Sequence, residues 1–237
     1  GKQIGEIWGY ETDRLFQEGD FVDNGGTREY AEGIPTQDII FSNRVPFPGD
    51  VKYKDLNGDG KVDYGDAYTL DDHGDYKVIG NSRSRYQYGI RLGANYKGID
   101  LSIFLQGVAK KDYWTSGAFA FTAGSQYESI FVHTLDYWST ENTDAFYPRP
   151  DDRSYNKKPQ TKYLLNAAYM RLKMIKLGYS IPKNVLSKIK LESVKIYVTG
   201  ENLFLFTGLP KGMDPELGAS HTFPLAKDFS IGTTITF

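Results

Sequence analysis

An acidic segment, Asp55–Asp66, has the residue types and the spacing of a calcium-binding loop. Such a loop takes oxygen ligands from positions 1, 3, 5, 7, 9 and 12, using the backbone carbonyl at position 7 and glycine at position 6. The ligand positions are filled by Asp55, Asn57, Asp59, Lys61 through its carbonyl, Asp63 and Asp66. Gly60 stands at the sharp turn. The spacing therefore predicts a structural calcium site.

Two alternatives accompany this prediction. Asp66 stands where such loops usually carry glutamate, and its shorter side chain makes magnesium the alternative metal. A surface turn rich in Asn, Asp and Gly that binds no metal is the other alternative. Val62 at position 8 is expected to pack against the rest of the fold. A calcium-sensing role is disfavoured, because the sequence predicts no flanking helices and contains no second copy of the loop.

Aromatic residues gather in the long connection between residues 109 and 165. Exposed aromatic faces in a long loop can stack on sugar rings or hold peptide side chains, which makes this group a candidate ligand-binding surface. The candidates are Tyr113, Trp114, Phe119, Phe121 and Tyr127. The alternative is that these rings form the core of the loop or an aromatic girdle at a membrane interface.

The elements that must position these residues are β-strands. Apolar and polar residues alternate over 86–96 and 99–108, and the Lys97-Gly98 pair between them predicts a tight hairpin. Three further strands are predicted at 169–181, 193–206 and 229–237. The predicted fold class is therefore all-β.

The connections between these strands alternate in length. The links at 97–98 and 182–192 are short, whereas those at 51–85, 109–165 and 207–228 are long. Short turns at one end and long loops at the other are typical of a transmembrane antiparallel β-barrel, and a soluble β-sandwich is the alternative. Because the smallest such barrels have about 8 strands, we expect the chain to be a fragment of a larger barrel.

Composition and motifs exclude several other classes. The chain has 28 Lys+Arg against 30 Asp+Glu, and this net charge of −2 argues against nucleic-acid binding. It contains no Cys, which excludes disulfides and thiolate chemistry. No apolar run reaches the ~18 residues of a membrane helix, and the first residues do not form a signal peptide. No nucleophile elbow, phosphate-binding loop or zinc helix motif occurs, so we expect no enzymatic activity.

Short motifs along nearly the whole chain, in a specific order, resemble the C-terminal part of the SusC/RagA-type TonB-linked outer-membrane transporters of Bacteroidetes. They are 4–13 (IGEIWGYETD), 49–53 (GDVKY), 79–81 (IGN), 96–101 (YKGIDL), 106–107 (QG), 136–142 (DYWSTEN), 169–173 (YMRLK), 200–204 (GENLF) and 212–216 (GMDPE). The resemblance implies a plugged barrel of about 22 strands, of which residues 1–237 supply the C-terminal strands and loops.

The resemblance also implies a function for the intact protein. It would import nutrient oligomers, glycans first and peptides second, together with a SusD-like surface lipoprotein that could touch the 113–127 aromatics. TonB would act through an N-terminal part absent from these residues. The long loops would lie outside the cell, and the strands would contact outer-membrane lipid. The terminal strand resembles the signal recognised by the barrel-assembly machinery, through Phe229, Ile231, Ile235 and Phe237.

A second functional class remains open at this point. The same alternating strands, acidic loop and loop aromatics would suit a secreted, calcium-stabilised β-sandwich that binds carbohydrate. The two hypotheses differ in what the apolar faces of residues 86–106 contact. In the transporter these faces meet lipid, and in the sandwich they meet a second packed sheet.

Overall fold

The computed structural model describes residues 2–66, 69, 71–115, 121, 131–151, 155–189, 191–217 and 225–237. The chain divides into two compact units. The loop unit comprises Gly1–Ser82 and Tyr113–Leu164, and the sheet unit comprises Arg83–Asp112 and Leu165–Phe237. Among the described residues, no helix combines the length and the apolar character needed to cross a membrane.

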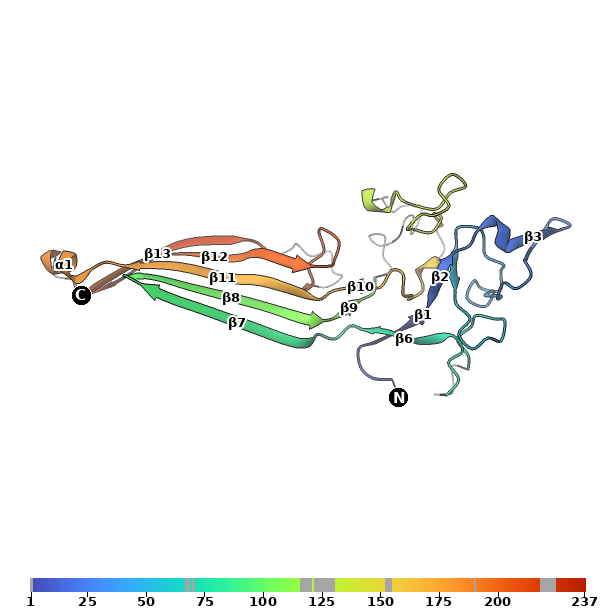
Figure 1. Cartoon of the computed structure of the whole chain (residues 1–237), viewed down its shortest axis with the longest axis horizontal. Coiled ribbons are helices and arrows are strands. Elements are labelled where there is room, and N and C mark those ends of the chain that lie inside the picture. Colours follow the sequence, from blue (N-terminus) through green and yellow to red (C-terminus); the bar gives the residue numbers. More distant parts are fainter. Residues whose placement is uncertain are drawn as a thin grey trace. The chain divides into compact units, whose positions relative to one another are not determined.

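The sheet unit contains five long antiparallel strands that follow one another across the sheet (Figure 1). They are β7 (Arg85–Tyr96), β8 (Ile99–Lys110), β11 (Tyr169–Ser180), β12 (Ser193–Thr207) and β13 (Asp228–Thr236). The order β7, β8, β11, β12, β13 makes each strand the neighbour of the next long strand in the chain. These strands match the predicted ones to within a few residues, and the predicted all-β class is confirmed.

The turn between β7 and β8 is tight because both of its residues adopt positive φ. Lys97 has φ 48° and Gly98 has φ 86°, as a two-residue hairpin turn of this hand requires. Beyond β11, the predicted short link carries one small helical segment. It consists of α1 (Lys183–Leu186) followed by the 3-10 turn η4 (Ser187–Ile189).

One face of this sheet is apolar and exposed. The strand register aligns apolar side chains across all five strands, for example in the row Ala94, Leu101, Leu177, Val198 and Ile231. The next row, on the opposite face, is mostly polar and consists of Gly93, Ser102, Lys176, Thr199 and Ser230. Leu177 and Ile231 are 51% and 76% exposed. This alternation is the pattern of strands with lipid on one side and a polar interior on the other.

The loop unit is built on three two-stranded antiparallel sheets. The pairs are β1 (Glu6–Tyr10) with β6 (Tyr76–Asn81), β2 (Thr12–Leu15) with β5 (Val51–Tyr53), and β3 (Phe21–Asn24) with β4 (Thr27–Tyr30). The 3-10 turns are η1 (Glu18–Asp20), η2 (Val132–Thr134) and η3 (Tyr155–Lys157). Two further short strands, β9 (Asp112–Tyr113) and β10 (Leu165–Asn166), lie where the chain passes between the units.

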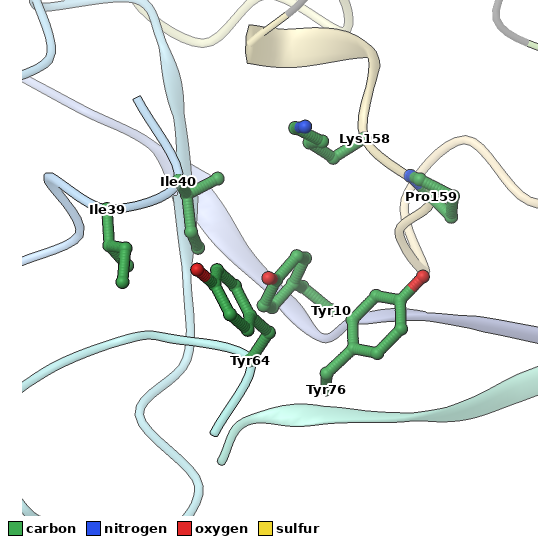
Figure 2. A pocket seen from close by; sticks show the side chains of 7 residues that line it. All are labelled: Tyr10, Ile39, Ile40, Tyr64, Tyr76, Lys158 and Pro159. Carbon is green, nitrogen blue, oxygen red and sulfur yellow. The ribbon is translucent and has the colours of Figure 1, made fainter. Parts of the chain in front are cut away.

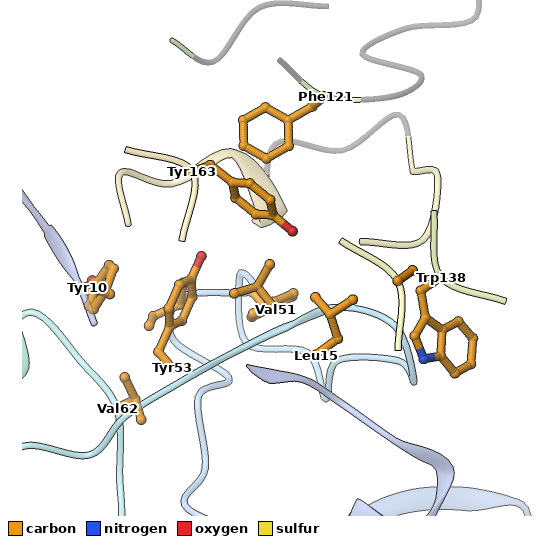
Figure 3. Packing of buried hydrophobic residues seen from close by; sticks show 11 residues of the cluster. Tyr10, Leu15, Val51, Tyr53, Val62, Phe121, Trp138 and Tyr163 are labelled. Atoms are coloured by element: carbon orange, nitrogen blue, oxygen red, sulfur yellow. The ribbon is translucent and has the colours of Figure 1, made fainter. Parts of the chain in front are cut away.

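Aromatic side chains dominate the core of the loop unit (Figure 3). Tyr53, Phe121 and Tyr163 are almost fully buried, and the ring centroids of Phe121 and Tyr163 lie 5.0 Å apart. Gly49 is required beside this core, because it has φ 87° and an added Cβ would collide with the Trp138 ring. The segments predicted as two separate long loops, 51–85 and 109–165, therefore contribute to one core together with residues from 10 to 41.

Candidate functional site

The acidic loop has a backbone turned inward around its first carboxylate. The two oxygens of Asp55 accept hydrogen bonds from the backbone N–H of Gly58 (2.6 Å) and Gly60 (2.8 Å). The Asp59 carboxylate accepts one from the backbone N–H of Lys61 at 2.8 Å. Gly58 and Gly60 have φ 78° and 81°, so glycine at these positions is required by the turn.

The loop is attached to the fold at its C-terminal half. Val62 is 1% exposed and belongs to the core, as predicted for position 8. The backbone of Thr36 accepts a hydrogen bond from the Val62 N–H (2.7 Å) and donates one to the Gly60 carbonyl (3.0 Å). Buried Asp75 accepts hydrogen bonds from the backbone N–H of Leu56 (2.5 Å) and Asp63 (3.0 Å). Asp75 is a structural residue that the spacing of the motif did not reveal.

The donor chemistry of this loop suits a hard cation, but its carboxylates are engaged by the backbone. Asp63, like Asp55 and Asp59, accepts a hydrogen bond from a backbone N–H, in this case that of Gly65 (2.7 Å). Within the part of the chain that the structure describes, no three His, Asp or Glu side chains gather as a metal-holding group. The described loop is therefore held by hydrogen bonds, and calcium or magnesium binding stays a prediction for Asp55, Asn57, Asp59, Lys61, Asp63 and Asp66.

A cavity of about 210 Å³ lies beside the acidic loop, within the loop unit (Figure 2). The side chains of Tyr10, Tyr64 and Tyr76 lie around it. Ile39 and Ile40 border it on one side, and Lys158 and Pro159 on the other. Tyr64 follows Asp63 directly, so the acidic loop supplies one wall. None of these residues was a sequence candidate, because five separate segments supply them.

The predicted aromatic surface is only partly described by the structure. Phe121 is 2% exposed and packs against Tyr163 and Trp114. Its ring belongs to the core of the loop unit and cannot present a face to a ligand in this conformation, which corrects that assignment. Tyr113 and Trp114 are half-buried, and Trp114 packs against the same core. Phe119 and Tyr127 lie outside the described residues.

Phe229, Ile231 and Ile235, three of the four residues predicted as an assembly signal, lie on the exposed apolar face of the sheet, and Phe237 follows the last strand. Phe229, Ile231, Ile235 and Phe237 are 74%, 76%, 49% and 90% exposed. Phe229, Ile231 and Ile235 alternate with polar or small residues along β13, the last strand of the sheet. This placement agrees with the predicted alternation, and recognition by an assembly machinery stays a prediction.

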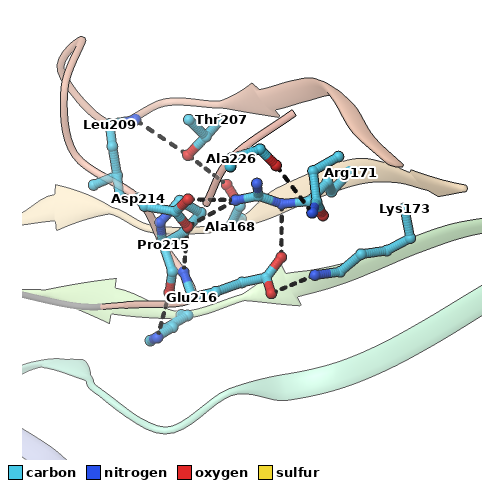
Figure 4. Close-up of polar contacts among 11 residues, drawn as sticks. Ala168, Arg171, Lys173, Thr207, Leu209, Asp214, Pro215, Glu216 and Ala226 are labelled. Atoms are coloured by element: carbon cyan, nitrogen blue, oxygen red, sulfur yellow. Dashed lines mark hydrogen bonds and ion pairs between the residues drawn. The ribbon is translucent and has the colours of Figure 1, made fainter. Parts of the chain in front are cut away.

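A charged cluster holds the segment after β12 onto the sheet unit (Figure 4). Arg171 Nη2 donates to both carboxylate oxygens of Asp214, each at 2.7 Å, and Arg171 Nε lies 2.7 Å from Glu216 Oε1. Glu216 Oε2 also pairs with Lys173 at 2.6 Å. The side chains of Arg171 and Asp214 are 3% and 7% exposed. Burial favours the neutral form of Asp214, but hydrogen bonds from the Glu216 backbone and Arg171 lower its pKa below the usual value.

Glu11 connects two of the small sheets in the loop unit through two lysines. It accepts a hydrogen bond from Lys54 at 2.6 Å and pairs with Lys77. The hydrogen bonds from Lys54 and Lys77 lower the pKa of Glu11 from 4.5 to about 2. A carboxyl group with a lowered folded-state pKa stabilises the fold above pH 4.5, and this contribution is lost as the pH falls toward 2.

We expect acid to destabilise the parent protein more than the Glu11→Gln variant. The difference between the two proteins in their loss of stability is small, because the Glu11 side chain is 27% exposed and solvent screens its ion pairs. The measurement is the melting temperature of both proteins at about pH 6 and about pH 3. The difference in melting temperature between the parent and Glu11→Gln should be smaller at about pH 3 than at about pH 6. An equal difference at both pH values would show that the ion pairs of Glu11 do not contribute to stability.

Comparisons with known proteins agree on one class. No protein-family model matches the chain. It is 28% identical over 216 residues to TonB-dependent receptor P3 of Formosa agariphila, and 26% identical over 178 residues to TonB-dependent receptor P26 of that organism. These alignments cover 91% and 71% of the chain. The predicted resemblance to TonB-dependent receptors is confirmed.

The structural comparison gives the same fold. A structure described as the RagAB peptide transporter matches 98% of the chain with a TM-score of 0.64 and 19% identity. An "open-open" structure of the RagAB peptide importer matches with a TM-score of 0.62 and 18% identity. The five strands therefore have the fold of part of a transporter β-barrel. The predicted outer-membrane location agrees with both comparisons.

The chain spans about a fifth of the length of the curated relatives it matches, with 19% of receptor P3 and 16% of receptor P26 covered. It covers 23% of the matched RagAB chain. The described strands accordingly form an open five-stranded sheet and not a closed barrel.

Proposed function

We propose that the polypeptide carrying this chain imports nutrient oligomers across the outer membrane, using energy delivered by TonB. The observation that carries the proposal is the five-stranded sheet, with an exposed apolar face and a mostly polar opposite face, in the fold of a transporter barrel. The relatives are described as receptors and transporters, and the protein would do no covalent chemistry. TonB would act through a part of the polypeptide outside these residues.

The cargo class is argued from the cavity and from the matched structures, and the partner from the resemblance. Glycans are the first choice because an aromatic-lined cavity lies in the loop unit. Peptides are the second, because the matched solved structures are described as peptide transporters or importers. By resemblance, the loop unit would face the outside of the cell and meet a SusD-like lipoprotein that captures cargo above it.

The first test is the size and the location of the native polypeptide. Source cells are fractionated, and the band that carries this sequence is mapped by mass spectrometry. A band several-fold heavier than 26.8 kDa in the outer membrane supports the proposal. A strain lacking the gene should then lose growth on a glycan or on a peptide mixture, which identifies the cargo class. A free 26.8 kDa species in the secreted fraction would overturn the proposal.

The secreted β-sandwich was the other candidate, and one observation speaks against it. In the described part of the chain, Leu92, Leu177 and Val198 on the apolar face are 52%, 51% and 48% exposed, so no second sheet covers them. A sandwich buries this face against its other sheet. Dependence of the intact protein on detergent is the result expected from the transporter.

We propose that calcium stabilises the acidic loop of the intact receptor. The support is the ligand spacing of the segment and the burial of Val62, which ties the loop to the core. Calcium on the order of 1 mM, the range of weak extracellular sites, should raise the melting temperature relative to a chelator. The double variant Asp55→Ala, Asp59→Ala should lose this increase.

The matched control for the calcium prediction changes an acidic pair outside the motif. The double variant Asp71→Ala, Asp72→Ala removes the same charge from the same connection. It should keep the calcium response. An equal calcium response in both double variants would show that Asp55 and Asp59 are not ligands.

A further inference from the structure

The cavity beside the acidic loop combines flat apolar walls with several hydroxyl groups. We propose that it binds one neutral pyranose ring of the cargo, enclosed by the rings of Tyr10, Tyr64 and Tyr76 and by the side chains of Ile39 and Ile40. The proposal deepens the proposed function, because it assigns the cargo class to a particular site. Figure 2 shows the three tyrosine side chains around this space, with Lys158 near its edge.

The size of the cavity fits a single ring. Pockets for drug-sized ligands have volumes of about 300–1,000 Å³, and this one measures about 210 Å³. One sugar unit, or one side chain, is therefore what it can enclose. A longer oligomer would leave its other units outside, where the exposed side chains of Tyr64 (46%) and Ile39 (45%) border the opening.

The hydroxyl groups favour a sugar among ligands of this size. Within the described part of the chain, the hydroxyls of Tyr10, Tyr64 and Tyr76 have no protein hydrogen-bond partner. A phenolic hydroxyl both donates and accepts, as each sugar hydroxyl does, so the two can pair in either direction. Burial, followed by the nearby Tyr76, Asp63 and Asp75, raises the pKa of Tyr10, which keeps its hydroxyl protonated and able to donate.

The charges around the cavity favour a neutral ring over an anionic one. Lys158 places one ammonium group at the edge. Asp63 and Asp75 act on the hydroxyl of Tyr10 from the acidic loop and its anchor. Asp75, which is not one of the predicted calcium ligands, balances the single ammonium group of Lys158, so no excess positive charge remains for a ligand carboxylate. A sugar without charge avoids this repulsion and still uses every hydroxyl.

The chemistry of the walls also suits a pyranose. One face of such a ring carries C–H groups and packs on apolar or aromatic surface, while its edge carries the hydroxyls. The cavity offers aliphatic side chains from Ile39 and Ile40 and aromatic rings from the tyrosines. Tyr10 is fixed by its neighbours, since its ring centroid lies 4.9 Å from that of Tyr53 and 5.0 Å from that of Tyr76. This wall is therefore formed before a ligand arrives.

The test measures binding directly, with the full-length receptor in detergent. The probes are maltohexaose, cellohexaose, xylohexaose and mannohexaose. Their binding is measured by saturation-transfer NMR and by calorimetry. We expect at least one of the four to bind and Tyr64→Ala to weaken it about fivefold to tenfold, the loss typical of one hydrogen bond with its contacts. Tyr64 is the residue to change because it is exposed, so its loss should leave the melting temperature unchanged.

The control is Tyr137→Ala, another exposed tyrosine of the loop unit that does not line the cavity. It should bind the probe as the parent does. Absence of binding by all four probes would overturn the proposal, and so would equal binding by the parent and Tyr64→Ala. A third result would also overturn the proposal. If the parent and Tyr137→Ala bind peptides of a tryptic casein digest and Tyr64→Ala does not, the cavity binds peptides.

Uptake by cells separates this proposal from the import function on which it rests. If Tyr64→Ala lowers sugar binding while receptor-bearing cells import nothing, the cavity stands and the import function fails. If cells import one of the probes and Tyr64→Ala binds it like the parent, the import function stands and the assignment of this cavity fails.

Discussion

Replacing Arg171 by Met is expected to destabilise the protein by about 3–5 kcal/mol, the cost of removing one partner of a buried ion pair. The guanidinium is 3% exposed and faces two carboxylates, those of Asp214 and Glu216. Removing it leaves the 7% exposed Asp214 without its cationic partner, and Lys173 can neutralise only Glu216. The segment that carries Asp214 should then detach from the sheet.

The graded variant Arg171→Lys separates charge from geometry. Lysine keeps the positive charge but lacks the planar guanidinium whose Nη2 and Nε reach Asp214 and Glu216 at the same time, so its effect should fall between those of the parent and Arg171→Met. The measurement is the heating midpoint of the folded receptor band on a gel, together with the rate of proteolysis within residues 208–217. Lys211→Met, an exposed change in the same segment, is the control. Equal midpoints for Arg171→Met and Lys211→Met would contradict the prediction.

The strands could be predicted from the sequence because their signal is local. Alternation along residues 86–96 and 229–237 depends only on which face each side chain takes, and that face is set by the period of two in a strand. The hairpin between β7 and β8 could be predicted equally well, since Lys97-Gly98 supplies the turn. The observed register keeps the two faces distinct across the sheet, because a slip by one residue would exchange them.

The loop unit could not be predicted in the same way. Its contacts join residues about a hundred positions apart, as when Asn156 accepts a hydrogen bond from the Val51 N–H at 2.8 Å. No periodic pattern records such pairings. The burial of Phe121 and the cavity that five segments form around Tyr10 depend on them. The acidic loop was the exception, because its spacing over a few residues is itself the signal, and the burial of Val62 was foreseen from it.

Replacing Asp50 by Ala is the change expected to loosen the loop unit most. Asp50 is 2% exposed, and its carboxylate accepts hydrogen bonds from Arg149 Nε (2.8 Å), Asn156 Nδ2 (2.9 Å) and the Phe47 N–H (2.8 Å). These bonds join residues 47–50 to residues 149–156. Losing them leaves buried donors without partners, which costs about 2–4 kcal/mol.

The readout for Asp50 is hydrogen exchange of backbone amides in the intact protein. In Asp50→Ala, exchange should accelerate in residues 47–53 and 155–161, while the amides of β11 and β12 keep their rates. Asp50→Asn keeps the shape but not the charge, so its effect should be smaller. Asp23→Asn, at an exposed position of β3 where an amide oxygen can still accept from the Gly26 N–H, should change nothing. Equal acceleration in β11 and β12 would mean that Asp50 stabilises the whole receptor and not the loop unit, because exchange through local opening leaves the remaining structure protected.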